Sequence, residues 1–127
     1  MAKEYVFRGK KIEDMKAMTL EELSKMFTAR ERRTMKRGFS DQEKKLIENI
    51  RKAPEKFHKT HVRNLIILPE MVGVRLGVFT GKEWFQLTVE PHMVGHRTGE
   101  FSIPVKRVKH SAPGIGASRG SKNIAVK

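Results

Sequence analysis

The sequence contains no cysteine and no long apolar segment among its 127 residues. Without cysteine the chain forms no disulfide, no thiolate nucleophile and no cysteine-based zinc site. Its most apolar run, Leu65-Ile66-Ile67-Leu68, has the length of a strand, whereas a membrane span needs about 20 apolar residues. The amino terminus lacks a secretory apolar segment as well, so we expect a cytoplasmic protein with no membrane partner.

Acidic residues are also scarce. The chain has 27 lysines and arginines against 14 aspartates and glutamates, a formal net charge of +13, and it has no acidic residue from Ser102 onward. A free globular protein with this imbalance repels itself, so the excess charge indicates a polyanionic partner. Lysine and arginine placed on phosphates release condensed counterions, and we therefore expect nucleic-acid binding.

The amino-terminal half contains helix signals. Residues 1–18 indicate an extended, irregular arm. Two capping boxes, which begin at Thr19 and Ser40, predict two short amphipathic helices. A basic run continues the first helix to a carboxyl end at Gly38, and Pro54 stops the second helix.

The middle of the chain contains strand signals. Residues 55–63 suggest a basic linker, and residues 65–68 a short apolar strand. Residues 74–79 and 84–89 alternate between apolar and other side chains around a turn at Gly81, which predicts an antiparallel hairpin. The expected fold class is therefore α+β: a small three-stranded, mainly antiparallel sheet packed by short helices, with basic extended segments at both ends.

Length favours one compact domain. We divide it into a basic amino-terminal arm with two short helices (1–63), a β core (64–110) and a basic flexible tail (111–127). The glycines and proline of the tail block regular structure, so we expect it to become ordered on a partner. Within the core, the segments 69–74 and 91–96 have similar sequences, and each of them predicts the same proline-initiated turn.

Candidate catalytic and metal sites lack the necessary context. His92 and His96 have the i, i+4 spacing of metal ligands, but zinc requires three or four protein ligands. We expect Glu100 to bond backbone or arginine, because acid–base catalysis needs an orienting partner. Gly114 and Gly116 begin like a dinucleotide fingerprint, but the third glycine comes one position late, at Gly120. We therefore expect no enzymatic activity and no cofactor.

Several alternatives stay open on these residues alone. Trp84 and Phe101 could stack on bases, as in single-stranded RNA binders; we expect Phe101 in the core and leave Trp84 undecided. The positive charge could instead serve an acidic protein, which would make the chain a basic adaptor. An RNA-processing enzyme is a third hypothesis, but no set of residues predicts turnover.

A series of short motifs lies in the β core. They are Leu68-Pro69-Glu70-Met71-Val72-Gly73, then Gly81-Lys82, then Met93-Val94-Gly95-His96 and Gly99-Glu100-Phe101-Ser102. In this order and at this spacing they resemble the signature of the ribosomal protein S-nineteen family. The resemblance is close over residues 60–110, and the ending at 110–117 is similar to the archaeal and eukaryotic branch.

The resemblance implies a role. Members of that family lie in the head of the small ribosomal subunit, bind the 3′ domain of its ribosomal RNA, and pair with ribosomal protein S-thirteen. Their carboxyl-terminal tail reaches towards the decoding region and tRNA near the aminoacyl site. Val74 departs from the histidine of many bacterial members, so no RNA contact is assigned there.

The expected RNA contacts come from two sources. The resemblance implies contacts in the turn at Lys82, at the end of the Met-Val-Gly-His motif at His96 and Arg97, and in the segment that leads into the tail. That segment contributes Lys106, Arg107, Lys109 and His110. Charge adds the basic helical run, the end of the basic linker and the tail, at Arg32, Arg33, Lys36, Arg37, Arg63, Arg119 and Lys122.

Overall fold

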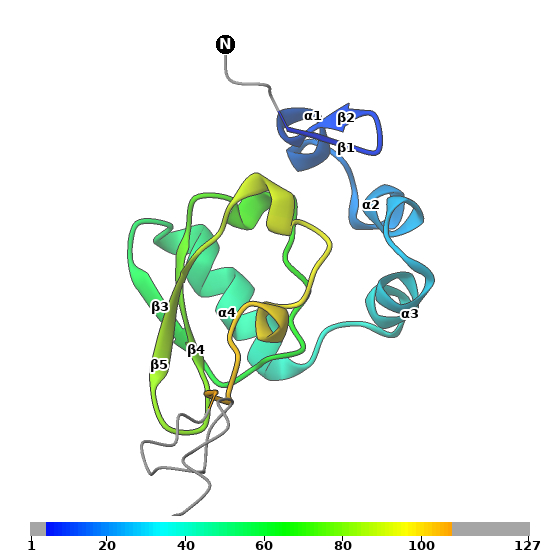
Figure 1. Cartoon of the computed structure of the whole chain (residues 1–127). Helices are drawn as coiled ribbons and strands as arrows, with labels where there is room; N and C mark the ends of the chain where they lie inside the picture. The colour runs from blue at the N-terminus through cyan, green and yellow to red at the C-terminus, as the bar shows by residue number, and fades with distance from the viewer. Residues whose placement is uncertain (1–4, 108–127) are drawn as a thin grey trace, which may run out of the picture.

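The structure is a computed structural model that describes residues 5–107. These residues form four α-helices, two small sheets and short 3₁₀ helices, which confirms the α+β class. In Figure 1 the amino-terminal hairpin and α1, α2 and α3 follow one another along one side of a unit built from α4 and the larger sheet. The predicted tail, 111–127, lies outside the described residues.

The amino-terminal segment is more regular than predicted. Strands β1 (Val6–Phe7) and β2 (Lys10–Lys11) form an antiparallel hairpin, and α1 (Ile12–Lys16) follows it directly. Arg8 and Gly9 make the turn with positive φ angles of 47° and 85°. The prediction of an irregular arm over 1–18 is wrong from residue 6 onward, because Met15 of α1 is fully buried in the core.

The first capping box forms as predicted. The Thr19 hydroxyl accepts the backbone N–H of Glu22, whose carboxylate accepts the N–H of Thr19, at the start of α2 (Leu20–Met26). The basic run does not continue this helix: it forms a separate helix, α3 (Ala29–Arg37), which ends at Gly38. The break falls at Phe27, whose backbone is extended and whose ring is buried.

The second capping box opens the longest helix of the described residues. The Ser40 hydroxyl accepts the N–H of Glu43, and α4 runs over Asp41–Lys52. The predicted stop before Pro54 is confirmed. The apolar stripe of α4 is buried in the core, through Leu46, Ile47 and Ile50.

The larger sheet differs from the predicted one in its first strand. Its order is β3 (Phe57–Thr60), β4 (Arg75–Phe79) and β5 (Trp84–Thr88). The β4–β5 pair is the predicted antiparallel hairpin, but β3 pairs with β4 in parallel. The predicted basic linker over 55–63 is therefore wrong in its middle, and the sheet is half parallel rather than mainly antiparallel.

Residues 65–68 do not form a strand of this sheet. They run through the centre of the molecule, with Leu65, Ile66 and Ile67 fully buried. Their backbone pairs with the segment at Arg97: a single antiparallel bridge joins Ile66 to Arg97, and the Ile67 N–H donates to the His96 carbonyl at 2.8 Å. The prediction that residues 65–68 are buried is therefore confirmed, whereas the prediction that they form a strand of the sheet is wrong.

The two Pro-initiated turns are confirmed. They are the 3₁₀ helices η1 (Pro69–Met71) and η2 (Pro91–Met93), each followed by a valine of extended backbone and a glycine of positive φ. The amide of Gly73 donates to Val89, and that of Gly95 donates to Ile67. The turns thus connect the ends of the β4–β5 hairpin to the buried segment.

Candidate nucleic-acid interface

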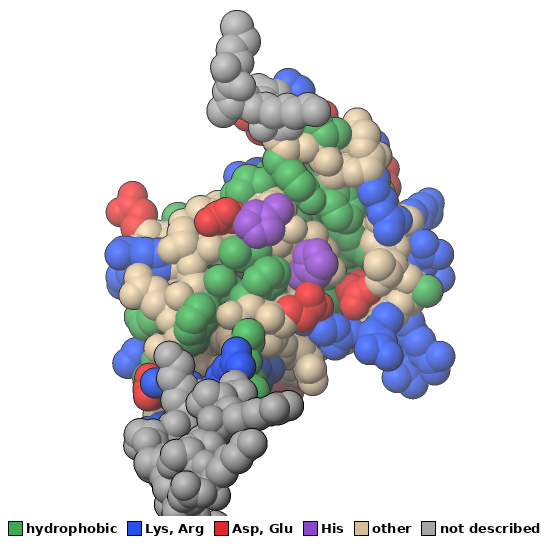
Figure 2. Space-filling view, in the orientation of Figure 1, with side chains coloured by type: hydrophobic (Ala, Val, Ile, Leu, Met, Phe, Trp, Pro, Cys, Tyr) green, Lys and Arg blue, Asp and Glu red, His purple; other side chains and the backbone are tan. Residues whose placement is uncertain are grey.

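The exposed surface of α3 carries a group of cations. Arg33, Lys36 and Arg37 are exposed and lie in the second half of the helix. Figure 2 shows lysine and arginine side chains gathered on the side of the molecule where α3 lies. Cations near a helix carboxyl end are favoured by its negative dipole. Their density on one solvated surface suits a phosphate backbone.

Arg32 belongs to the same predicted run but is used inside the protein. Its Nε donates to the Ser24 carbonyl at 3.2 Å, and its Nη2 donates to the carbonyls of Lys25 and Phe27. These carbonyls lie at the carboxyl end of α2, where no intrahelical partner is available. Arg32 therefore caps α2 and fixes its angle to α3.

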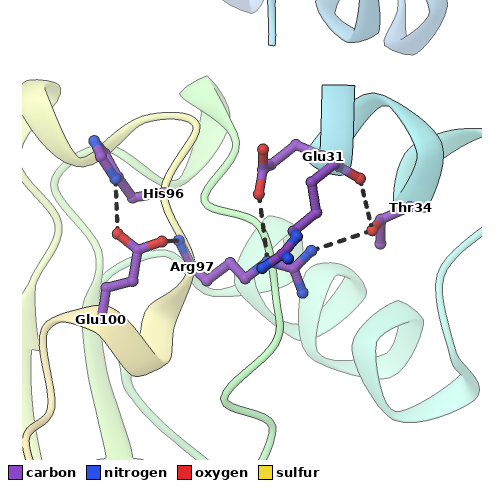
Figure 3. A network of polar contacts seen from close by, with 6 residues as sticks. Glu31, Thr34, His96, Arg97 and Glu100 are labelled. Atoms are coloured by element: carbon purple, nitrogen blue, oxygen red, sulfur yellow. Dashed lines mark hydrogen bonds and ion pairs between the residues drawn. The ribbon is translucent and has the colours of Figure 1, made fainter. Parts of the chain in front are cut away.

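Arg97 is also partly buried, although it was predicted to face RNA. Its Nε lies 3.4 Å from Oε1 of Glu31, and its Nη2 donates to the Thr34 hydroxyl at 3.2 Å (Figure 3). The Arg97 side chain is 21% exposed and the Glu31 side chain is 10% exposed. This ion pair joins α3 to the loop between η2 and η3 (Thr98–Glu100).

His96 points outward on that loop. Its Nδ1 lies 2.7 Å from Oε2 of Glu100, whose Oε1 accepts the backbone N–H of Arg97 (Figure 3). Glu100 therefore bonds backbone, as predicted from the sequence. The contact to Nδ1 orients the imidazole and leaves Nε2 as the ring nitrogen that can meet a ligand.

Arg63 is the most extensively bonded arginine of the predicted site. Its guanidinium donates to the carbonyls of Phe79, Gly99 and Ser102 and to the Ser102 hydroxyl. Most donors of an arginine fork are thus used within the chain. Arg63 connects the end of the β4 strand to the segment that leads into the tail.

The other predicted cations divide by position. Lys82 is exposed in the β4–β5 turn beside Gly81, and Lys106 and Arg107 are exposed at the end of the described chain. The remaining four lie outside the described residues: Lys109, His110, Arg119 and Lys122.

Sequence reasoning missed an aromatic group on the sheet. The rings of His61, Phe79 and Trp84 lie 4.7–5.0 Å apart between centroids, and the Lys59 ammonium lies 5.4 Å from the Trp84 ring centre. The alternation of side chains along β4 and β5 was enough to predict that Phe79 and Trp84 share one face. The position of Lys59 beside them could not be predicted in this way, because it depends on the parallel pairing of β3 with β4.

A hollow beside His96 has a different character. It encloses about 390 Å³, and its lining includes the rings of Phe7 and Phe27, the carboxylates of Glu31 and Glu100, and Arg8. Carboxylates disfavour phosphate, so the hollow is not part of the basic surface. Across residues 5–107, no three histidine, aspartate or glutamate side chains come together as metal ligands.

Comparison with known proteins identifies relatives over nearly the whole chain. A family model described as "Ribosomal protein S19" matches residues 33–110. Proteins named "Small ribosomal subunit protein uS19" are similar: that of Saccharolobus solfataricus is 45% identical over 98% of this chain and 93% of its own length. Those of Metallosphaera sedula and Methanococcoides burtonii are 44% and 43% identical, covering 98% of this chain and 93% and 90% of their own lengths. In the described part of the chain, no helix is long and apolar enough to cross a membrane.

Proposed function

Because this chain belongs to the ribosomal protein S19 family, we propose that it is a structural component of the small ribosomal subunit. Archaeal relatives named for that subunit cover nearly all of the chain, and this similarity carries the proposal. The chain is accordingly a ribosome-bound protein of the cytoplasm that acts in translation. It is a structural protein of the ribonucleoprotein rather than an enzyme.

The finer proposal concerns where it binds. We infer that it contacts the 3′ domain of the small-subunit ribosomal RNA in the head of the subunit, next to ribosomal protein S-thirteen. The tail extends from there towards the decoding site and the tRNA in the aminoacyl site. These assignments rest on the family resemblance and on the acid-free composition after Ser102.

The contacts with RNA are proposed at exposed cations that the fold does not use. Arg33, Lys36 and Arg37 present one surface on α3, and Lys82 presents another in the hairpin turn. Arg32, Arg63 and Arg97 of the predicted set support these surfaces from inside through hydrogen bonds. The mechanism is assembly: neutralising crowded phosphates stabilises a compact arrangement of the RNA. The further predicted contacts are His96, Lys106, Arg107, Lys109, His110, Arg119 and Lys122.

A sedimentation experiment tests the function directly. A cell lysate is separated on a sucrose gradient, and each fraction is probed for the chain before and after a high-salt wash. We expect co-migration with the small subunit that survives the wash. A chain that stays at the top of the gradient bound to an acidic protein would support the adaptor hypothesis instead.

A pair of charge reversals tests the proposed surface. Lys36→Glu with Arg37→Glu removes two cations of α3, and Lys44→Glu with Lys45→Glu removes two exposed cations of α4. Binding to a 3′-domain RNA fragment is titrated at several salt concentrations. We expect the α3 variant to bind more weakly and to lose about one unit of salt slope per cation. Equal losses for both variants would contradict the assignment to α3.

A further inference from the structure

The β3–β4–β5 sheet has one face against the core and one face in solvent. Leu76 and Leu87 are paired in the register and belong to the same core as Ile47 and Ile50 of α4, so α4 covers their side. Side chains alternate along a strand. The opposite face therefore carries the alternate positions, and most of them are exposed: Phe57, Lys59, His61, Arg75, Gly77, Phe79, Trp84, Gln86 and Thr88.

Aromatic rings occupy one end of this solvent face. Phe79 and Trp84 are direct partners across β4 and β5, with centroids 5.0 Å apart. His61 lies 4.7 Å from Phe79 and 4.9 Å from Trp84. Trp84 is nevertheless 38% exposed. The neighbouring rings hold the indole in place while part of it stays accessible.

The other end of the face carries a second ring. Phe57 lies across Gly77, because a Cβ added to this glycine would be 2.5 Å from Cζ of Phe57. The absence of a side chain at Gly77 lets the ring lie on the backbone of β4. The face thus carries an aromatic ring over Gly77 as well as the rings at its other end.

The charges on the face have one sign. Lys59 lies beside the indole, and Arg75, which donates to the Glu55 carbonyl at 2.9 Å, lies at the Phe57 end. None of the eight side chains at these positions is acidic. The turn before this end of β5 presents one cation, Lys82, and one carboxylate, Glu83, both exposed. On the face itself, aromatic rings lie among cations without carboxylates, and this combination complements a base and its phosphates.

We propose that this face binds an unpaired nucleobase of RNA, which stacks on Trp84 while Lys59 contacts the adjacent phosphate. The inference rests on the proposed ribosomal RNA binding and adds a mode of recognition to it. Stacking of a base on an aromatic ring raises affinity by about 5- to 150-fold, whereas an exposed cation–π contact contributes about 2- to 5-fold. A base can therefore displace the Lys59 ammonium, whose flexible stem can reach a phosphate.

An apolar protein surface fits this face less well. Docking of such a surface would bury Lys59 and Arg75 away from water, and no carboxylate on the face could neutralise them. Desolvating unpaired charges is costly. An RNA strand supplies both the flat apolar surface and the negative charge.

The single tryptophan of the sequence makes the proposal measurable. The full chain is titrated with a 3′-domain ribosomal RNA fragment, while RNA anisotropy reports binding and Trp84 emission reports stacking. We expect binding with strong quenching of the emission. Binding without a change in emission would overturn the stacking proposal and leave the proposed function intact. Absence of any binding would overturn both.

Substitutions supply an independent test. Trp84→Leu is expected to weaken binding by about 5- to 150-fold, whereas Trp84→Phe keeps a ring and most of the affinity. Phe85→Leu removes an exposed ring from the opposite face of the same strand, so it is the control and should bind like the wild type. Circular dichroism verifies that each variant is folded. Equal affinities for Trp84→Leu and the wild type would overturn the proposal, as would emission that changes only when another ribosomal protein is added.

Discussion

Arg97 Nε lies 3.4 Å from Oε1 of Glu31, although the two residues are 66 positions apart in the chain. The pair joins the exposed basic helix α3 to the loop that carries His96. Glu31 is the acidic residue of an otherwise basic helix, and it is buried, 7% exposed as a residue. The orientation of the proposed α3 surface therefore depends on an ion pair that is largely buried.

Removing one member of this pair should destabilise the fold. Arg97→Ala leaves the Glu31 carboxylate without its cation, and we expect the free energy of unfolding to fall by about 2–4 kcal/mol in urea denaturation. The double variant Glu31→Leu with Arg97→Met should lose less, because no buried charge stays unpaired. The single variants Glu31→Leu and Arg97→Met are measured beside it. If the loss of unfolding free energy in the double variant equals the sum of the losses in the two single variants, the two side chains are not coupled.

Arg63 allows its structural and RNA-binding roles to be separated. Arg63→Lys keeps the charge but cannot reach the carbonyls of Phe79, Gly99 and Ser102 together. We expect a loss of about 2–3 kcal/mol in stability. We expect little change in RNA affinity when binding is measured well below the melting temperature. A large loss of RNA affinity in a variant with unchanged stability would show instead that Arg63 contacts RNA.

Gly99 should tolerate no side chain. An added Cβ would lie 2.9 Å from the Arg63 carbonyl oxygen, a backbone atom that accepts the Gly99 N–H. Gly99→Ala is expected to cost about 1–3 kcal/mol, because backbone must move to admit the methyl group. Amide exchange at residue 99 should accelerate with the loss of this hydrogen bond. Unchanged exchange in a fully stable variant would contradict the close packing.

The capping box of α2 should make stability depend on pH. The backbone N–H of Thr19 donates to the Glu22 carboxylate and, together with the Thr19 hydroxyl, lowers the pKa of Glu22 below its ordinary value. A depressed carboxyl pKa stabilises the fold above the unfolded-state pKa, and that contribution disappears as pH falls through the folded-state pKa.

Glu22→Gln therefore tests the predicted direction of this pH dependence of stability. We expect the stability difference between wild type and this variant to be largest near neutral pH and to shrink on acidification. Glu21→Gln removes the neighbouring exposed carboxylate, which does not take part in the capping box, and is the matched control. Thermal denaturation across the acidic range measures both, and a difference that grows towards low pH would exclude the proposed cause.

The segment that leads into the tail should contribute to RNA binding more than α1 does. Lys106→Glu with Arg107→Glu reverses charges in an acid-free segment, whereas Lys16→Glu changes a cation near Glu13 and Asp14. We expect the first variant to weaken binding to the 3′-domain fragment more, with a lower salt slope. Equal losses in a titration would count against this segment as a contact with RNA.

The sequence alone determined the elements whose causes are local. The two capping boxes predicted the starts of α2 and α4, because a side chain that caps reaches only three residues along the chain. The period of two predicted the β4–β5 hairpin, and the repeated proline and glycine predicted η1 and η2. The same short-range patterns carried the family resemblance, which the matched relatives confirmed.

The tertiary structure alone decided which cations are free. Arg32, Arg63 and Arg97 look like their exposed neighbours in the sequence, but their partners are carbonyls and carboxylates contributed by other elements. It also decided that β3 joins β4 in parallel, and thereby brought His61 to Phe79 and Trp84. Parallel pairing and buried ion pairs join residues that are distant in the chain, so no local pattern encodes them, and only the packed core brings them together.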